Sequence, residues 1–82
     1  MNQVKTLFFA TLRDRAGVRS TELEIPPQTN VAEFKGLLIE KFPALAGLIN
    51  HTLISINNEY AFDETMIPSN AEIALFPPVS GG

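Results

Sequence analysis

The chain has 82 residues with a formal net charge of -3, and 45% of them are hydrophobic, which suits one small domain with a modest core. Because the positive residues form no run and no apolar run reaches membrane-spanning length, neither nucleic acid nor a membrane is expected as a partner. Without cysteine there is no disulfide and no thiol nucleophile, so we expect a reducing, cytoplasmic location.

Two strands are predicted at the start of the chain. Residues 4–10 are rich in apolar and β-forming side chains and predict the first strand. Residues 13–17 are typical of a turn, in which Gly17 is free to take a positive φ. Residues 20–25 alternate polar and apolar, which predicts a second strand in a hairpin with the first. The proline pair at 26–27 ends it, because neither residue has an amide hydrogen to donate.

A helix is predicted in the middle of the chain. Asn30 can cap it, and Glu33 three positions later completes the spacing of a capping box. The apolar residues that follow recur at helical spacing, and Leu38 is predicted to be one of the core residues. Pro43 stops the helix. Residues 44–49 then form a short apolar connector with room for one helical turn.

Three short strands complete the prediction. Residues 52–56 and 59–62 are joined by a turn at Asn57-Asn58, and residues 72–76 follow another turn at 68–70. One helix must then cover one face of a mixed sheet of about four to five strands, which is an α+β, β-grasp (ubiquitin-like) arrangement. The right-handed crossover rule places the strand after the helix parallel to an earlier strand.

The chain offers no self-contained active site. His51 is the single histidine, and catalytic use of a histidine needs a positioned partner, so a surface role is expected. Glu22 and Glu24 lie two apart on a predicted strand and form a solvated face rather than an acid/base pair. No Gly-rich phosphate loop and no metal-ligand cluster is present in the sequence. We therefore expect no bound cofactor and no metal.

Residues 77–82 differ in character from the predicted domain, residues 1–76. The two prolines stop strand pairing and favour an extended path, and the last residues add almost no bulk. Six extended residues reach about 20 Å, so we expect a thin, flexible arm that carries an unhindered carboxylate through a narrow channel. A frayed, inert end is the alternative, which the prolines disfavour. The arm comprises Pro77, Pro78, Val79, Ser80, Gly81 and Gly82.

These residues carry a resemblance to a known family. Residues 7–10, Arg13 and Gly17, Asn57, and the ending LFPPVSGG at 75–82 resemble the small subunit of molybdopterin synthase, one of the ubiquitin-like sulfur carriers with a β-grasp fold. The resemblance covers the whole chain. PPVSGG is its specific part, because a bare Gly-Gly would not separate this family from ubiquitin or the thiamine sulfur carrier.

The resemblance implies a cycle centred on Gly82. An E1-like adenylyltransferase consumes ATP to form a glycyl adenylate, and a sulfur donor protein converts it to a thiocarboxylate (1-thioglycine). The large synthase subunit then receives the arm within a heterotetramer, where sulfur passes to cyclic pyranopterin monophosphate. The small subunit is accordingly no enzyme on its own. One departure, Asn70-Ala71-Glu72 where relatives often have Gly-Asp-Glu, affects a turn and leaves the arm untouched.

Alternation predicts a docking patch on the open face of the sheet. Lys5 and Glu72 face water, so outward positions follow at every second residue, while Phe8 and Ala10 should face the helix. Such patches mark partner surfaces, although single exposed apolar residues are ordinary. Arg13 is either a contact for an acidic group on the activating enzyme or a solvated loop residue. The predicted patch consists of Leu7, Phe9, Tyr60 and Phe76.

Other functions share this fold. A protein modifier would join Gly82 to a lysine of a target protein after the same adenylation step. A thiamine sulfur carrier would use the same chemistry, but those chains are usually shorter and lack the PPVSGG ending. A plain binding module would leave the arm inert.

Overall fold

The computed structural model describes residues 2–78. None of the helices in this range has the length and apolar character needed to cross a membrane. The elements in chain order are β1 (Asn2–Phe8), α1 (Thr11–Ala16), β2 (Ser20–Ile25), α2 (Val31–Lys41), the 3-10 helices η1 (Pro43–Leu45) and η2 (Ile49–His51), β3 (Leu53–Ile56), β4 (Glu59–Ala61) and β5 (Glu72–Phe76).

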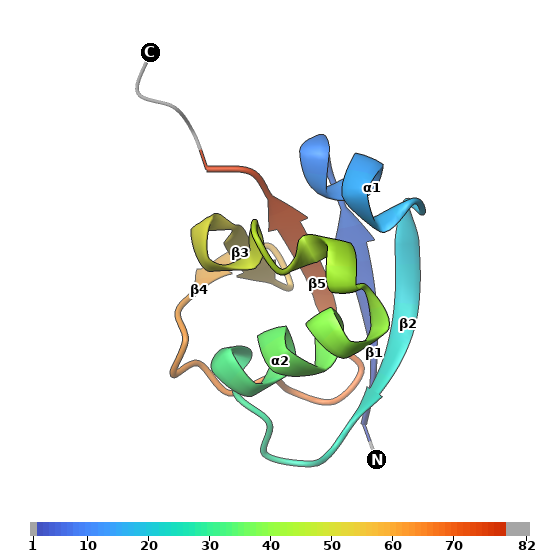
Figure 1. Cartoon of the computed structure of the whole chain (residues 1–82). Helices are drawn as coiled ribbons and strands as arrows, with labels where there is room; N and C mark the ends of the chain where they lie inside the picture. Colours follow the sequence, from blue (N-terminus) through green and yellow to red (C-terminus); the bar gives the residue numbers. More distant parts are fainter. Residues whose placement is uncertain (1, 79–82) are drawn as a thin grey trace.

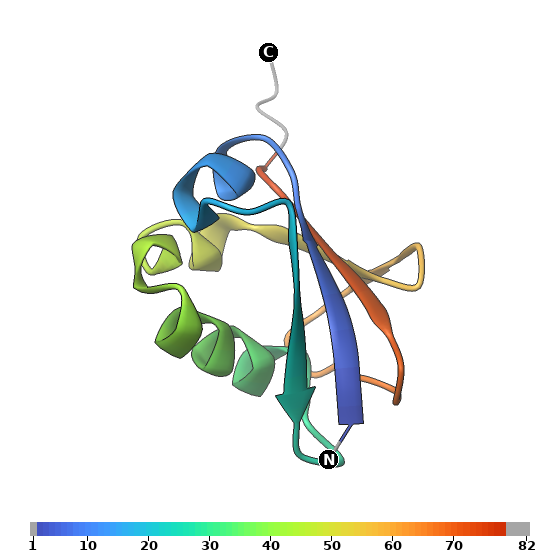
Figure 2. The same cartoon turned by 90° about the vertical axis from the view of Figure 1, so that its right-hand side faces the viewer.

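The strands form one five-stranded sheet in the order β2-β1-β5-β3-β4. Strand β1 pairs antiparallel with β2 and parallel with β5, while β3 pairs antiparallel with both β5 and β4. Strand β3 therefore runs in the same direction as β2, as the crossover rule predicts, although β1 and β5 separate the two. The helices cover one face and leave the other open (Figure 2). This confirms the predicted α+β, β-grasp fold.

The start and end of α2 follow from the residues that predicted them. The Asn30 Oδ1 accepts the Glu33 N–H at 2.9 Å, and the Glu33 Oε1 accepts the Asn30 N–H at 3.0 Å. This capping box satisfies backbone donors that the first turn leaves free. At the other end the Phe42 N–H donates to the Leu38 carbonyl at 2.8 Å, and Pro43 opens η1. The predicted helix is confirmed.

The core lies between the inner face of the sheet and α2. Phe8 from β1 and Leu38 from α2 are both buried, as predicted. The Phe8 ring meets the Phe42 ring edge-on, with centroids 5.3 Å apart, which joins the sheet to the end of the helix. The largest fully buried side chains are Phe34, Leu12, Ile25, Leu38, Leu45, Ile49, Ile73, Leu75, Val4, Val31 and Thr6.

The segment after β1 differs from the prediction. Residues 13–17 do not form a simple turn, because Thr11–Ala16 is the helix α1, anchored by the buried Leu12. The expectation that Ala10 faces the main helix is wrong: β1 ends at Phe8, and Ala10 is exposed with φ of 52°. Gly17 does adopt a positive φ, 81°, and its N–H donates to the Arg13 carbonyl at 2.9 Å to end α1.

Candidate functional site

The parallel pairing of β1 and β5 brings α1 and the root of the arm together. Parallel strands have their carboxyl ends at the same edge of a sheet. In Figure 1 the arrowheads of both strands point to the end at which α1 lies. Pro77, half-buried, and Pro78, exposed, follow β5 at this edge. The predicted arm residues Val79, Ser80, Gly81 and Gly82 lie outside the described residues.

Two aromatic rings stack at the root of the arm. The rings of Phe9 and Phe76 are nearly parallel, with an interplanar angle of 10° and centroids 4.8 Å apart. The Phe9 N–H donates to the Leu75 carbonyl at 3.2 Å, which extends the pairing of β1 with β5 by one residue. Phe9 remains 41% exposed and Phe76 is half-buried. The stack thus presents apolar surface while fixing the point at which the arm leaves.

A second row of side chains crosses the open face two residues before the stack on both β1 and β5. Leu7 lies opposite Ala74, Ala74 opposite Ser55, and Ser55 opposite Tyr60. Ala74 and Ser55 are buried, whereas Tyr60 is 72% exposed. Ser55 and Asn58 line a shallow hollow of about 210 Å³ that Tyr60 and Phe76 flank. The structure therefore places all four predicted patch residues on one face, at the end that bears the arm.

Arg13 lies on α1, at the same end of the molecule. Its side chain is exposed, and it borders an open hollow together with Gly17 and Arg19. The structure thus puts a positive charge beside the root of the arm. The role of Arg13 as a contact for an acidic partner stays a prediction.

Sequence reasoning missed two apolar residues of this surface. Leu53 of β3 lies opposite Phe76, and Leu53 and Phe62 border the same hollow of about 430 Å³. Phe62 is 74% exposed and comes directly after β4. The alternation that singled out Tyr60 also reaches Phe62, the last residue of the predicted strand at 59–62, but the predicted patch did not include it.

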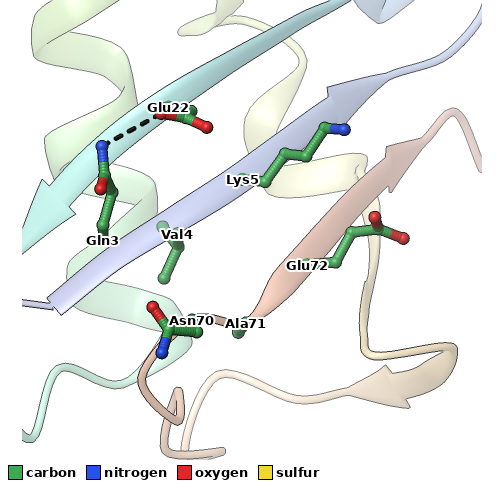
Figure 3. A pocket seen from close by; sticks show the side chains of 7 residues that line it. All are labelled: Gln3, Val4, Lys5, Glu22, Asn70, Ala71 and Glu72. Carbon is green, nitrogen blue, oxygen red and sulfur yellow. Dashed lines mark hydrogen bonds between the residues drawn. The ribbon is translucent and has the colours of Figure 1, made fainter.

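The far end of the open face has the opposite character. Lys5 lies opposite Glu22 on one side and Glu72 on the other. The Gln3 amide donates from Nε2 to the Glu22 Oε2 at 3.0 Å, beside a polar hollow of about 240 Å³ (Figure 3). The open face is therefore polar where β1 begins and apolar where it ends. A partner protein that buries apolar area in a complex is therefore expected to cover the end of this face that bears the arm.

The fold defines a ubiquitin-like β-grasp protein, and its open face carries exposed apolar side chains at the end where β5 leads into Pro77 and Pro78. The chain belongs to the ThiS family, whose model matches residues 6–82. A curated relative, the molybdopterin synthase sulfur carrier subunit of Caenorhabditis briggsae, is 34% identical over 84 residues, which cover 100% of both chains.

Solved structures extend this comparison. Small archaeal modifier protein 1 from Haloferax volcanii superimposes with a TM-score of 0.87 at 26% identity, covering 96% of this chain and 100% of that one. A complex of subunits 1 and 2 of the molybdopterin-converting factor from Helicobacter pylori contains a chain with a TM-score of 0.69 and 22% identity, covering 98% and 99%. At that identity the second likeness shows the fold alone.

Proposed function

We propose that this chain is a sulfur carrier in molybdenum cofactor biosynthesis, acting as the small subunit of molybdopterin synthase. The observation that carries the proposal is the stacked Phe9–Phe76 pair at the root of the arm. It supplies exposed apolar surface where the arm begins, in a chain that aligns over its full length with a curated sulfur carrier subunit.

The chemistry proposed for the arm needs no catalytic group on this chain. A carboxylate is a poor acceptor, so an activating enzyme first joins the Gly82 carboxylate to the AMP part of ATP and releases pyrophosphate. A sulfur donor then displaces AMP, which leaves a thiocarboxylate on Gly82. That sulfur is the nucleophile in the final transfer to cyclic pyranopterin monophosphate, after which water cleaves its bond to the Gly82 carbonyl carbon and restores the carboxylate. Positioning and charge stabilisation come from the partner's pocket.

Two partners must therefore recognise the same end of the molecule in turn. The large synthase subunit and the E1-like activating enzyme would both cover the patch of Leu7, Phe9, Tyr60 and Phe76. The curated relative from Caenorhabditis briggsae is named a subunit of molybdopterin synthase, which supports an arrangement with a second subunit. Arg13 beside the arm adds a charge that would favour an acidic group on the activating enzyme.

The test is a two-step reconstitution with purified components. The chain is first incubated with the activating enzyme, ATP and a sulfur donor, and its intact mass is followed. We expect the mass change for replacement of one carboxyl oxygen by sulfur, located at Gly82 by fragmentation. The loaded chain and the large subunit should then produce molybdopterin from cyclic pyranopterin monophosphate. The proposal would be overturned if the chain acquired no sulfur, or if the loaded chain transferred no sulfur to cyclic pyranopterin monophosphate.

A second candidate, a protein modifier, is favoured by the likeness to small archaeal modifier protein 1 at 26% identity. In this case Gly82 would form an isopeptide bond with a lysine of a target protein. Conjugates joined through Gly82 in cell extracts would support the modifier, whereas free thiocarboxylate without such conjugates would support the carrier. Complementation of two strains, one lacking the molybdopterin synthase small subunit and one lacking the thiamine sulfur carrier, separates a molybdenum cofactor role from a thiamine role.

A further inference from the structure

Phe62 continues the stacked pair at the root of the arm into a row across the end of the sheet. The Phe9 ring stacks on Phe76, Phe76 lies opposite Leu53, and Leu53 shares a hollow with Phe62. The row therefore crosses β1, β5, β3 and the end of β4 in sheet order. Among the described residues, Phe62 is the most exposed large apolar side chain. We call Phe9, Phe76, Leu53 and Phe62 the terminal row.

The backbone around Phe62 is held firmly despite the exposure of the ring. The Phe62 N–H donates to the Thr65 Oγ1 at 2.9 Å, and the Phe62 carbonyl accepts the Thr65 N–H at 3.0 Å. The Asp63 and Thr65 carbonyls accept the Ala32 and Val31 N–H groups of α2, at 3.1 and 3.0 Å. These bonds fix the turn to the helix, so the exposed Phe62 ring is carried by a pre-ordered backbone.

An ion pair reinforces the turn and leaves a neighbouring charge available. The Lys35 Nζ lies 2.8 Å from the Asp63 Oδ1, and the Lys35 side chain is only 17% exposed. Glu64 is exposed, and within residues 2–78 the structure records no ion pair for it. Glu64 borders the open hollow on the far side of Phe62. The Phe62 end of the row is therefore acidic, whereas at the α1 end Arg13 and Arg19 border one hollow with a single carboxylate, Asp14.

We propose that Phe62 is an anchor of the docking interface, and that the partner meets it with an apolar hollow bordered by a cationic side chain facing Glu64. This inference rests on the proposed function, because the occupant is the large subunit that receives the arm. An exposed aromatic side chain on a pre-ordered backbone has only two χ angles to restrict on binding, which is typical of an anchor. Opposite charges at the two ends of the row would fix the rotation of the partner about the arm.

The test compares matched surface variants for binding to the purified large subunit. Phe62→Ser removes the proposed anchor, and Met66→Ser removes another exposed apolar side chain, 51% exposed, from outside the row. We expect Phe62→Ser to weaken the affinity about tenfold or more. Met66→Ser should change it by no more than about twofold. Circular dichroism and thermal melting confirm that both variants fold.

Charge and turnover provide two further measurements. Glu64→Lys should slow association at low salt, and the difference from the original chain should shrink as salt rises. At saturating large subunit, loaded Met66→Ser should transfer sulfur at the original rate, because its arm is unchanged and Met66 lies outside the row.

The outcomes separate this inference from the proposed function. If the original chain binds and donates sulfur while Phe62→Ser and Met66→Ser bind equally well, Phe62 is no anchor and the proposed function stands. If Glu64→Lys associates with the large subunit as fast as the original chain at low salt, the partner has no cationic side chain facing Glu64. If the original chain neither binds the large subunit nor acquires sulfur, the proposed function fails and this inference fails with it.

Discussion

The aromatic rings of Phe9 and Phe76 stack with their centroids 4.8 Å apart. Phe9 follows the end of β1 and Phe76 ends β5, so the contact joins the carboxyl ends of two parallel strands. Aromatic pairs of this kind contribute about 0.5–1.5 kcal/mol beyond their burial. The stack therefore holds the end of β5, from which Pro77 continues, and forms the centre of the predicted patch of Leu7, Phe9, Tyr60 and Phe76.

Phe76→Asp should weaken binding to the large subunit. The substitution breaks the stack and places a charge at the centre of an apolar interface, for which a loss of about 2–4 kcal/mol is expected. Titration calorimetry measures the affinity, with Met66→Asp as the control outside the patch. Circular dichroism should show an intact fold. An unchanged affinity with the fold intact would remove the patch from the account.

Core truncation should cost much of the stability of this small domain. Leu38 from α2 and Phe8 from β1 are both buried. Replacing either with alanine should lower the free energy of unfolding by about 2–5 kcal/mol. The exposed Glu40 on α2 supplies a control, since Glu40→Ala should change the free energy of unfolding by no more than about 0.5 kcal/mol. Urea unfolding measures the free energy for each variant. If neither Leu38→Ala nor Phe8→Ala lowers it, the packing of β1 against α2 is contradicted.

Thr6→Val should stabilise the domain. The Thr6 side chain is fully buried on β1, and its Oγ1 has no hydrogen-bond partner among residues 2–78. Valine keeps the shape and removes the unsatisfied hydroxyl, so the free energy of unfolding should rise by about 1 kcal/mol. Thr21 lies opposite Thr6, but its Oγ1 accepts a hydrogen bond from the Lys41 Nζ at 3.0 Å. Thr21→Val should bring no such gain, and equal gains at both positions would count against the argument.

Asn57 should matter through both its backbone and its side chain. It has φ of 51°, its Oδ1 accepts the Glu72 N–H at 2.9 Å, and its own N–H donates to the Glu72 carbonyl at 2.8 Å. Asn57→Ala loses the side-chain bond and strains the backbone, at a cost of about 1–3 kcal/mol. Asn57→Gly tolerates this φ and should cost less. The reverse order in denaturant unfolding would refute the role of backbone strain.

The main helix and the last strands could be predicted because their signals are local. Asn30 and Glu33 specify the start of α2 through contacts three residues apart, and Asn57-Asn58 marks a hairpin in which both residues do take positive φ. The fold follows from the order of these elements. The patch residues could be assigned to one face because side chains alternate between the two faces along each strand, whichever strands pair with it.

Features set by tertiary contacts escaped prediction. Helix α1 has only six residues, too few for a clear periodic pattern, and the burial of Leu12 holds it in place. Phe62 lies beyond the last residue of β4, where a turn bonded to α2 fixes its backbone. Neither the cross-strand position of Leu53 nor that turn can be read from spacing along the chain.

The central claim is that the terminal carboxylate on Gly82 is the working group. Deleting Gly82 leaves a glycine carboxylate on Gly81 but draws it back by about 3.5 Å. Misplacement by about 1 Å can already cost roughly a hundredfold in a catalytic step. Adding one residue after Gly82 moves the carboxylate too far by a similar distance. Neither change touches the docking patch, so both altered chains should fold and bind the large subunit.

The most direct measurement is molybdopterin formation from cyclic pyranopterin monophosphate by the large subunit and each chain after loading with sulfur. The account predicts formation with the original chain and a loss of about a hundredfold or more with the shortened and extended chains. Full activity from both altered chains would show that the position of the terminal carboxylate does not matter, and would contradict the sulfur-carrier account.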